Sequence, residues 1–381
     1  MINRTFITLL VLPLLPTNVI GEITGDISLK NIFYVNEVSS SYQYETVVEG
    51  KLSNAGDLYS VSYEYDFIFR SSDQDPGKEL ADFRQLYFTF DLGGSEVSLG
   101  AKQVFWGVTE SKNVVDVINQ RDIVGGQSAE YKLGTPAVSV LSYYGDAEVE
   151  YWYMPKSRQQ TNYSENSREG FGAPIGAVTF SNKSEKYGGD HAVRLFYSSG
   201  NFDFAISSFE GLARSPISTP NGGVIDQNYP YQSSTGLELQ YTSDAALLKL
   251  EAIGGKQGLS EFEATTFGVE TTAYGISDTN YDLGLILEAQ LDNRPQALSE
   301  EMLAYLLRLV ANNSSDTEIV LAYLDDLLGE QSLVSLSGSH RLRNGLLIEL
   351  EARKVNAANS LLPLYALERD DSVALNFKYF F

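Results

Sequence analysis

Residues 373–381 read V-A-L-N-F-K-Y-F-F, with an apolar or aromatic side chain at every second position. An uncovered apolar edge strand of this kind would pair with other chains in a soluble protein. A closed barrel avoids that pairing, because its last strand pairs with its first and no edge remains. The stretch therefore predicts a terminal barrel strand. Its lipid-facing side chains would be Val373, Leu375, Phe377, Tyr379 and Phe381.

The same alternation runs through most of the chain. Its clearest instance is L-Y-S-V-S-Y-E-Y-D-F-I-F-R, Leu58 to Arg70, where one face carries three tyrosines and two phenylalanines. A strand of about 12 residues is long for a soluble protein but suits a tilted strand that crosses a bilayer. Soluble sandwiches alternate too, so strand length and number decide the class. We count eighteen candidate strands, centred near residues 31, 47, 64, 86, 99, 140, 150, 194, 205, 238, 250, 268, 286, 306, 321, 335, 349 and 376.

The strand count depends partly on Glu301 to Asn312, which reads almost equally well as an amphipathic helix. A helix there would leave an odd number of strands, which single-chain bacterial barrels avoid. We therefore predict an all-β fold, a closed antiparallel transmembrane β-barrel of about 18 strands, with about 16 as the alternative. This barrel would occupy residues 22–381 as one domain.

The predicted connections alternate between short and long. Short, turn-like links are expected at 52–57, 93–94, 145–146, 199–200 and 243–244. Longer links are expected at 70–80, 105–135, 155–190, 211–233 and 356–371. The link around Val38 to Ser41 is an exception, because it is short where a loop is expected. Short periplasmic turns and long extracellular loops are the layout of an outer-membrane barrel.

Residues 1–21 have the pattern of a secretory signal peptide. Arg4 gives the positive start, Phe6 to Leu15 the apolar run, and small residues precede a cut before Glu22. A buried N-terminal helix is the alternative, but two prolines would break it. The chain is therefore expected to leave the cytoplasm.

The composition agrees with export to a membrane. The chain has no cysteine, so disulfides and thiolate metal sites are excluded. Its 24 tyrosines and 19 phenylalanines suit the aromatic girdles of a barrel. The formal charge is −23, and −24 once the signal peptide with its single arginine is removed. A nucleic-acid partner, which needs clustered Lys and Arg, is not expected.

The C-terminal pattern carries a resemblance. Alternating residues that end in Phe381, with Tyr379 and Phe377 before it, resemble the C-terminal signal of bacterial outer-membrane proteins. The resemblance implies that the barrel assembly machinery reads these residues and that the chain resides in the outer membrane of a Gram-negative bacterium. Outer-membrane lipid and lipopolysaccharide are then its expected surroundings.

A second resemblance lies in S-L-G-A-K-Q-V-F-W-G-V-T-E-S-K-N-V-V-D-V-I-N-Q-R-D, Ser98 to Asp122. It is similar to a block of poorly characterised porin-like outer-membrane families, in which a basic residue, a Gln and a Trp-Gly pair precede a loop with an Asn and an Asp. The matching residues are Gly100, Lys102, Gln103, Trp106, Gly107, Asn119 and Asp122. The resemblance supports the class and implies no substrate.

The loop after this block, Val108 to Thr135, is long enough to be functional. Its V-V-D-V-I segment is too apolar for a solvated loop, so we expect it to pack inside the barrel and narrow a channel. Alternatively, Trp106 and Gly107 merely anchor the loop and pack the wall. The residues predicted at or near the constriction are Lys102, Trp106, Glu110, Asp116, Asn119, Arg121 and Asp122.

The alternation predicts an acidic lumen. Its expected lumen-facing residues include Glu64, Asp66, Glu238, Glu251, Glu288, Glu349, Glu351 and Arg353, together with Glu148, Glu150 and Asp282. The expected basic set is smaller: Arg70, Arg84, Lys102, Arg194, Lys249, Arg353 and Lys378. Rings of carboxylates favour cations in a pore, so a modest cation preference is predicted. The alternative is that these charges pair across the wall and leave little net field.

Enzymatic chemistry finds no support in the sequence. The two histidines, His191 at a strand start and His340 in an expected periplasmic turn, have no evident nucleophile partner, and no G-x-S-x-G motif is present. Asp73 to Gly77 begins like a calcium loop but lacks the later ligands, so we interpret it as an ordinary turn. We predict no catalytic residue, no cofactor and no metal site.

The predicted function is an outer-membrane channel for small hydrophilic solutes. A substrate-specific channel, with the third loop and Lys102 forming a binding site, is one alternative. Another is a non-conducting structural or adhesive barrel that acts through the long loops 155–190 and 211–233. The sequence leaves the oligomeric state open, a homo-oligomer included.

Overall fold

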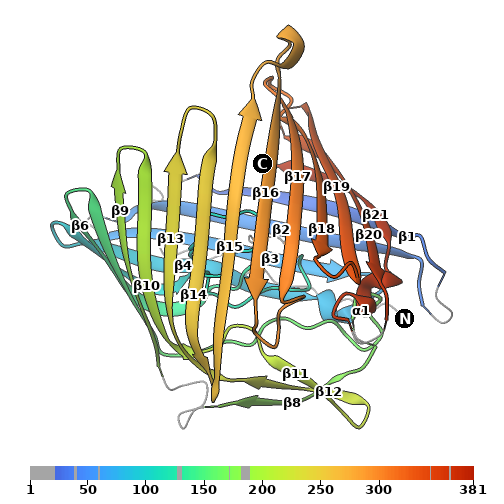
Figure 1. The fold of residues 1–381 in the computed structure, drawn as a ribbon, viewed down its shortest axis with the longest axis horizontal. Coiled ribbons are helices and arrows are strands. Elements are labelled where there is room, and N and C mark those ends of the chain that lie inside the picture. The colour runs from blue at the N-terminus through green and yellow to red at the C-terminus, as the bar shows by residue number, and fades with distance from the viewer. Residues whose placement is uncertain are drawn as a thin grey trace.

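The computed structural model describes residues 22–37, 41–58, 61–126, 131–170, 172–181, 189–343, 345–359 and 362–381. The expected signal peptide lies outside these residues. The described chain forms a closed antiparallel barrel of eighteen strands (Figure 1). Each of the eighteen predicted strand centres falls within one of these strands, so the predicted fold class and strand count are confirmed.

The barrel strands follow chain order and pair with their sequence neighbours, apart from the closing pair. Their bounds are β1 (Thr24–Tyr34), β2 (Tyr44–Leu58), β3 (Val61–Ser72), β4 (Leu80–Asp91), β5 (Ser95–Lys102), β6 (Thr135–Tyr144), β7 (Ala147–Met154), β9 (Asp190–Ser199), β10 (Phe202–Leu212), β13 (Tyr231–Thr242), β14 (Leu247–Gln257), β15 (Ser260–Ala273), β16 (Tyr281–Asp292), β17 (Glu301–Ala311), β18 (Thr317–Asp326), β19 (Gln331–Arg343), β20 (Leu346–Ala357) and β21 (Ser372–Phe380).

The C-terminal strand closes the barrel. β21 pairs with β1 over a register that runs from Asp26 opposite Phe380 to Tyr34 opposite Ser372. Phe377 and Tyr379 are exposed on the outer surface, whereas Asn376 on the other face is buried inside the barrel. The chain thus ends on an aromatic row because that row is one part of the barrel's outer surface.

The two rims differ as predicted, with two exceptions. The expected turn at 52–57 is wrong: these residues continue β2 and pair with β3, from Leu52 opposite Phe67 to Asp57 opposite Ser62. The polar residues of the segment mimic a turn, but their alternation still suits a strand. At the long-loop rim, β14 and β15 are joined by two residues only, 258–259, which the sequence did not lead us to expect.

The links between the barrel strands carry the remaining elements. β8 (Ile175–Phe180) pairs in parallel with β12 (Val224–Tyr229), and β12 pairs with β11 (Ile217–Asn221). This small sheet lies beyond one end of the barrel (Figure 1). Short helical turns are η1 (Pro76–Lys78), η3 (Ile276–Asp278) and α1 (Tyr365–Glu368). Among the described residues, no helix is long and apolar enough to span a membrane.

The two faces of the wall have opposite character. Outward side chains are largely aliphatic and aromatic, for example Leu285, Leu350 and Phe377, each at least 38% exposed. Inward positions hold most of the buried polar and charged residues. An apolar outer band around a polar interior is the arrangement of a membrane-spanning barrel, because lipid contacts one face and water or buried loops contact the other.

Two neighbouring residues of β20 test this assignment of faces. Leu350→Arg places a charge on the apolar outer surface and should lower the free energy of unfolding by about 2–4 kcal/mol, as for lipid-facing arginines near the midplane. Glu349→Arg, one position away and facing inward, should change stability far less. Urea unfolding of the refolded variants in lipid vesicles measures both. Equal losses would mean that the register is shifted by one residue.

Candidate channel and its inward-folded loop

The described residues of the loop between β5 and β6, here called L3 (103–126 and 131–134), lie inside the barrel. Its V-V-D-V-I segment buries Val115 and Ile118 completely, as the sequence predicted. These side chains form one apolar cluster with Trp106 and with inward residues of the wall. The wall members are Ala137, Trp152, Met154, Ala192, Phe209, Ile253, Phe262 and Ala264. L3 therefore packs against the side of the lumen formed by β6 to β15.

The backbone of L3 needs hydrogen-bond acceptors, because a loop inside a barrel has no ladder of its own. Glu251 of β14 accepts from three of the loop's N–H groups, those of Val108, Thr109 and Val115. Its Oε1 accepts from the N–H groups of Val108 at 2.7 Å and Thr109 at 2.9 Å, and from Thr109 Oγ1 at 2.7 Å. Gly107 has a positive φ of 134°, and a Cβ there would lie 2.6 Å from Glu251 Oε1. Its positive φ and this close approach therefore favour glycine at position 107.

Two further carboxylates extend this set of acceptors. Glu288 of β16 accepts from the N–H groups of Glu110 at 2.8 Å and Ser111 at 2.7 Å. Glu238 of β13 accepts from Gly107 N at 3.2 Å, and Arg194 holds it through two bonds of 2.8 Å. These carboxylates face the lumen, but their charge is directed at the loop backbone.

Polar side chains also fasten the far part of L3. Asn119 accepts from Val104 N at 2.8 Å and donates to the carbonyls of Lys102 and Leu133 at 2.9 and 3.0 Å. It thereby ties the two ends of the loop together. The Asp122 carboxylate accepts two bonds of 2.9 Å from the Arg70 guanidinium of β3.

Burial and charged partners shift the pKa values of two carboxyl groups in L3, those of Asp116 and Asp122. Burial alone would raise the pKa of Asp122, but the hydrogen bonds and charge of Arg70 lower it. Burial instead dominates at Asp116, whose pKa is raised even though Lys132 pairs with it. Asp122 thus remains an ionised anchor for Arg70 near neutral pH.

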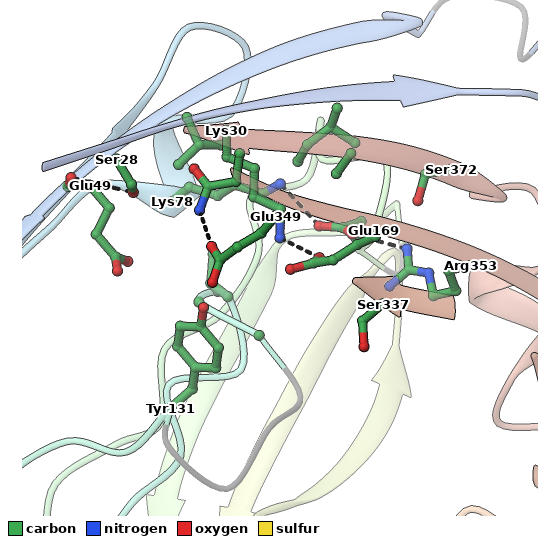
Figure 2. Close-up of a pocket in the computed structure, with 18 of the residues that line it drawn as sticks. Ser28, Lys30, Glu49, Lys78, Tyr131, Glu169, Ser337, Glu349, Arg353 and Ser372 are labelled. Carbon is green, nitrogen blue, oxygen red and sulfur yellow. Dashed lines mark hydrogen bonds and ion pairs between the residues drawn. The ribbon is translucent and has the colours of Figure 1, made fainter. Parts of the chain in front are cut away.

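Opposite L3, the lumen keeps an open chamber of about 470 Å³. Its wall is formed by β1, β2 and β19 to β21, and Tyr131 of L3 faces it (Figure 2). The ionisable side chains that line it are Lys30, Glu49, Lys51, Arg70, Lys78, Tyr131, Tyr163, Glu169, Glu349, Glu351, Arg353 and Lys378. Four serines on three strands add hydroxyl groups: Ser28, Ser335, Ser337 and Ser372. Charged and hydroxyl side chains therefore line the chamber together with aliphatic ones such as Ile32, Val47 and Leu333.

Most chamber charges are paired. Lys30 lies 2.6 Å from Glu351, and Lys51 lies 3.6 Å from Glu49. Arg353 lies 3.0 Å from Glu169. The alternative in which lumen charges pair across the wall thus describes this chamber.

The short-turn end of the lumen differs. Glu64, Glu96, Glu148 and Asp203 occupy the first few residues of their strands, and within the described residues none of them has an ion-pair partner. Glu64 accepts a hydrogen bond from Tyr87, and Asp203 accepts one from Ser198. This end therefore carries uncompensated negative charge.

The residues predicted at the constriction fall into two groups. Trp106, Asn119 and Asp122 are buried, and Asp116 is largely buried beside Lys132. Trp106 Nε1 donates to Glu150 at 3.1 Å.

The second group reaches the open lumen more closely. Glu110 is partly exposed and pairs with Lys249 at 3.0 Å. Lys102 stacks over the rings of Tyr87 and Trp152. Arg121 is partly exposed.

The predicted lumen-facing residues fall into three groups, which lie beneath L3, in the chamber and toward the short-turn end. Glu238, Glu251 and Glu288 hold L3, whereas Glu349, Glu351 and Arg353 line the chamber. Glu64 and Asp66 lie toward the short-turn end and bond Tyr87 and Ser53.

The sequence analysis did not identify Lys78 and Glu169 as chamber residues. They lie in two long loops and meet through a 3.0 Å ion pair, so neither periodicity nor spacing could join them. The only signal was indirect. Asp75 caps η1, and Lys78, the last residue of η1, directly follows the segment interpreted as an ordinary turn.

Neither histidine forms a catalytic arrangement. His191 in β9 bonds Tyr151 Oη at 2.9 Å. His340 lies within β19, where its Nδ1 is 2.8 Å from Thr317 Oγ1, so its predicted place in a turn is wrong. Among the described residues, no group of three or more His, Asp or Glu side chains could hold a metal ion.

The fold is similar to that of solved porins. A BenF-like porin from Pseudomonas fluorescens Pf-5 matches with a TM-score of 0.60 and 9% sequence identity. The match covers 96% of this chain and 98% of that chain. OccK3 (OpdO) from Pseudomonas aeruginosa matches with a TM-score of 0.55, 94% and 96% coverage, and 9% identity. OccAB4 from Acinetobacter baumannii matches with a TM-score of 0.54 and 11% identity, over 96% of this chain and 100% of that chain. No protein-family model matches the sequence, and no curated protein matches it significantly. The chain therefore shares the barrel fold of these porin structures.

Proposed function

We propose that this protein is a passive outer-membrane channel for small hydrophilic solutes. The observation that carries the proposal is the open chamber of about 470 Å³ beside L3, lined by charged and hydroxyl side chains. A purely structural barrel would gain nothing from keeping paired charges around an unfilled chamber, because placing charges inside a protein is costly. The fold of the similar porins is consistent with this function.

The proposed location is the outer membrane of a Gram-negative bacterium. The apolar outer band, the expected signal peptide at 1–21 and the terminal aromatic row support it. The barrel assembly machinery would then read Phe377, Tyr379 and Phe381, and lipopolysaccharide would surround the loop end.

We further propose a modest cation preference. It is supported by the unpaired carboxylates Glu64, Glu96, Glu148 and Asp203 at the short-turn end, because uncompensated charge sets the potential of a pore. The paired chamber charges contribute little net field. The preference would thus arise at the short-turn end of the lumen, here called the vestibule, where these four carboxylates lie.

The adhesive alternative has one observation in its favour. β8, β11 and β12 form a separate sheet beyond the barrel end, where a partner could reach it (Figure 1). A folded barrel without conductance would favour that function.

Releasing L3 should widen the channel. Glu251→Ala leaves the N–H groups of Val108 and Thr109 without their acceptor, at about 1–3 kcal/mol for each unsatisfied buried group. Single-channel recordings in planar bilayers should then show conductance higher by about twofold, with added noise. Glu351→Ala is the matched control, because it removes a lumen carboxylate that touches no part of L3. An unchanged conductance for Glu251→Ala would contradict the role of L3 as the constriction.

The cation preference can be tested by reversal potentials in a salt gradient. The double variant Glu96→Gln/Glu148→Gln should lower the cation-to-anion permeability ratio by about twofold, because it removes two vestibule charges. Glu263→Gln, on the outer surface of β15, should leave the ratio unchanged. Anion preference in the unmodified protein would refute this part of the proposal.

A further inference from the structure

The second inward segment belongs to the loop between β7 and β9. Its first part, residues 158–170, is here called the L4 strap. The strap begins on L3, where Thr161 N donates to Arg121 O at 3.3 Å and Tyr163 Oη donates to Ile123 O at 3.0 Å. It therefore starts on the filled side of the lumen.

The strap then crosses to the open side. Glu169 near its end lies 3.0 Å from Lys78 of η1 and 3.0 Å from Arg353 of β20. Tyr163 and Glu169 both line the chamber. Figure 2 shows Glu169 beside Arg353. Because the strap comes from the long-loop rim, it covers the chamber from that side.

The neighbouring Arg168 is fixed to the rim itself. Its guanidinium donates to the carbonyls of Tyr42, Asn36 and Arg369 at 3.1, 3.0 and 2.7 Å, and to the Asp370 carboxylate at 3.3 Å. These partners belong to the loops before β2 and before β21. Arg168 and Glu169 together fasten the strap to the opposite wall.

The strap differs from L3 in how it is held. Its buried side chains are polar, Ser167 and Arg168, and none of its residues belongs to the apolar core. Segments with few buried apolar contacts open at low free-energy cost. Buried ion pairs add little net stability, since both partners are well hydrated once they separate. The strap can thus leave while the barrel and L3 stay intact.

Glu169 is the central contact of this closure. Burial would raise its pKa, but Lys78 and Arg353 lower it to about 2. Its carboxylate is therefore charged at neutral pH and attracts both cations. Lys78 keeps a second partner, Glu45 at 2.8 Å, so it is not left without a counter-charge when Glu169 departs.

We propose that the L4 strap is a movable lid over the chamber, latched by Glu169 to Lys78 and Arg353 and by Arg168 to the rim. The lid rests on the proposed channel function, which it would regulate: solutes from the loop side reach the chamber when the latch opens. A fixed plug with the same contacts is the competing account.

The chain has no cysteine, so a single engineered thiol can report on access to the chamber. Ser337→Cys places that thiol on the chamber wall (Figure 2). A sulfonated, membrane-impermeant maleimide is applied to intact Gram-negative cells that display the protein, and the rate of labelling is measured. The latch is weakened by Glu169→Ala in the same background, and by Glu169→Gln as a milder variant that keeps hydrogen-bonding groups.

The lid predicts that labelling accelerates by about tenfold in both Glu169 variants, because the latch loses its charge. Glu270→Ala, which removes a lumen carboxylate of β15 outside the chamber lining, should leave the rate unchanged. Equal rates in all three variants and in the parent would overturn the lid. Conductance recorded in parallel separates the two proposals: faster labelling without conductance supports the lid and refutes the channel.

Discussion

The need of L3 for hydrogen-bond acceptors governs the interior of this barrel. A loop that enters a lumen brings backbone N–H groups that no strand can satisfy. Glu238, Glu251 and Glu288, on three strands of one wall, accept those groups directly. The loop's apolar residues then complete a core with the same wall. One side of the lumen is filled as a result, and the open chamber is confined to the other side.

Because of this asymmetry, the inward carboxylates have different roles on the two sides of the lumen. Carboxylates beneath L3 act as acceptors for backbone groups, and chamber carboxylates neutralise lysines and arginines, as Glu351 does for Lys30. Within the described residues, carboxylates near the short turns, such as Glu64 and Glu148, have no ion-pair partner and can act on passing ions. The total count of inward acids therefore says little about selectivity, because pairing and position decide which charges a solute meets.

The sequence was sufficient for the barrel because alternation is a local signal with a fixed period of two. It located all eighteen strands, and the even-number rule placed Glu301–Ala311 correctly among them. It failed at 52–57, where polar residues imitate a turn within β2. The inward packing of V-V-D-V-I was also predictable from its apolar character. The contact of Lys78 with Glu169 was not, because it joins two aperiodic loops through three-dimensional placement alone.

In the proposed channel, water and solutes would pass between L3 and the wall of β1, β2 and β19 to β21. Cysteine variants test it most directly, with conductance recorded before and after a charged methanethiosulfonate reagent is added. Ser372→Cys lines the chamber and should give a channel that the reagent partly blocks. Ser234→Cys is buried on the filled side, in β13, and should give a channel that does not respond. Block at Ser234→Cys without block at Ser372→Cys would contradict the account, because the path would then run on the side assigned to L3.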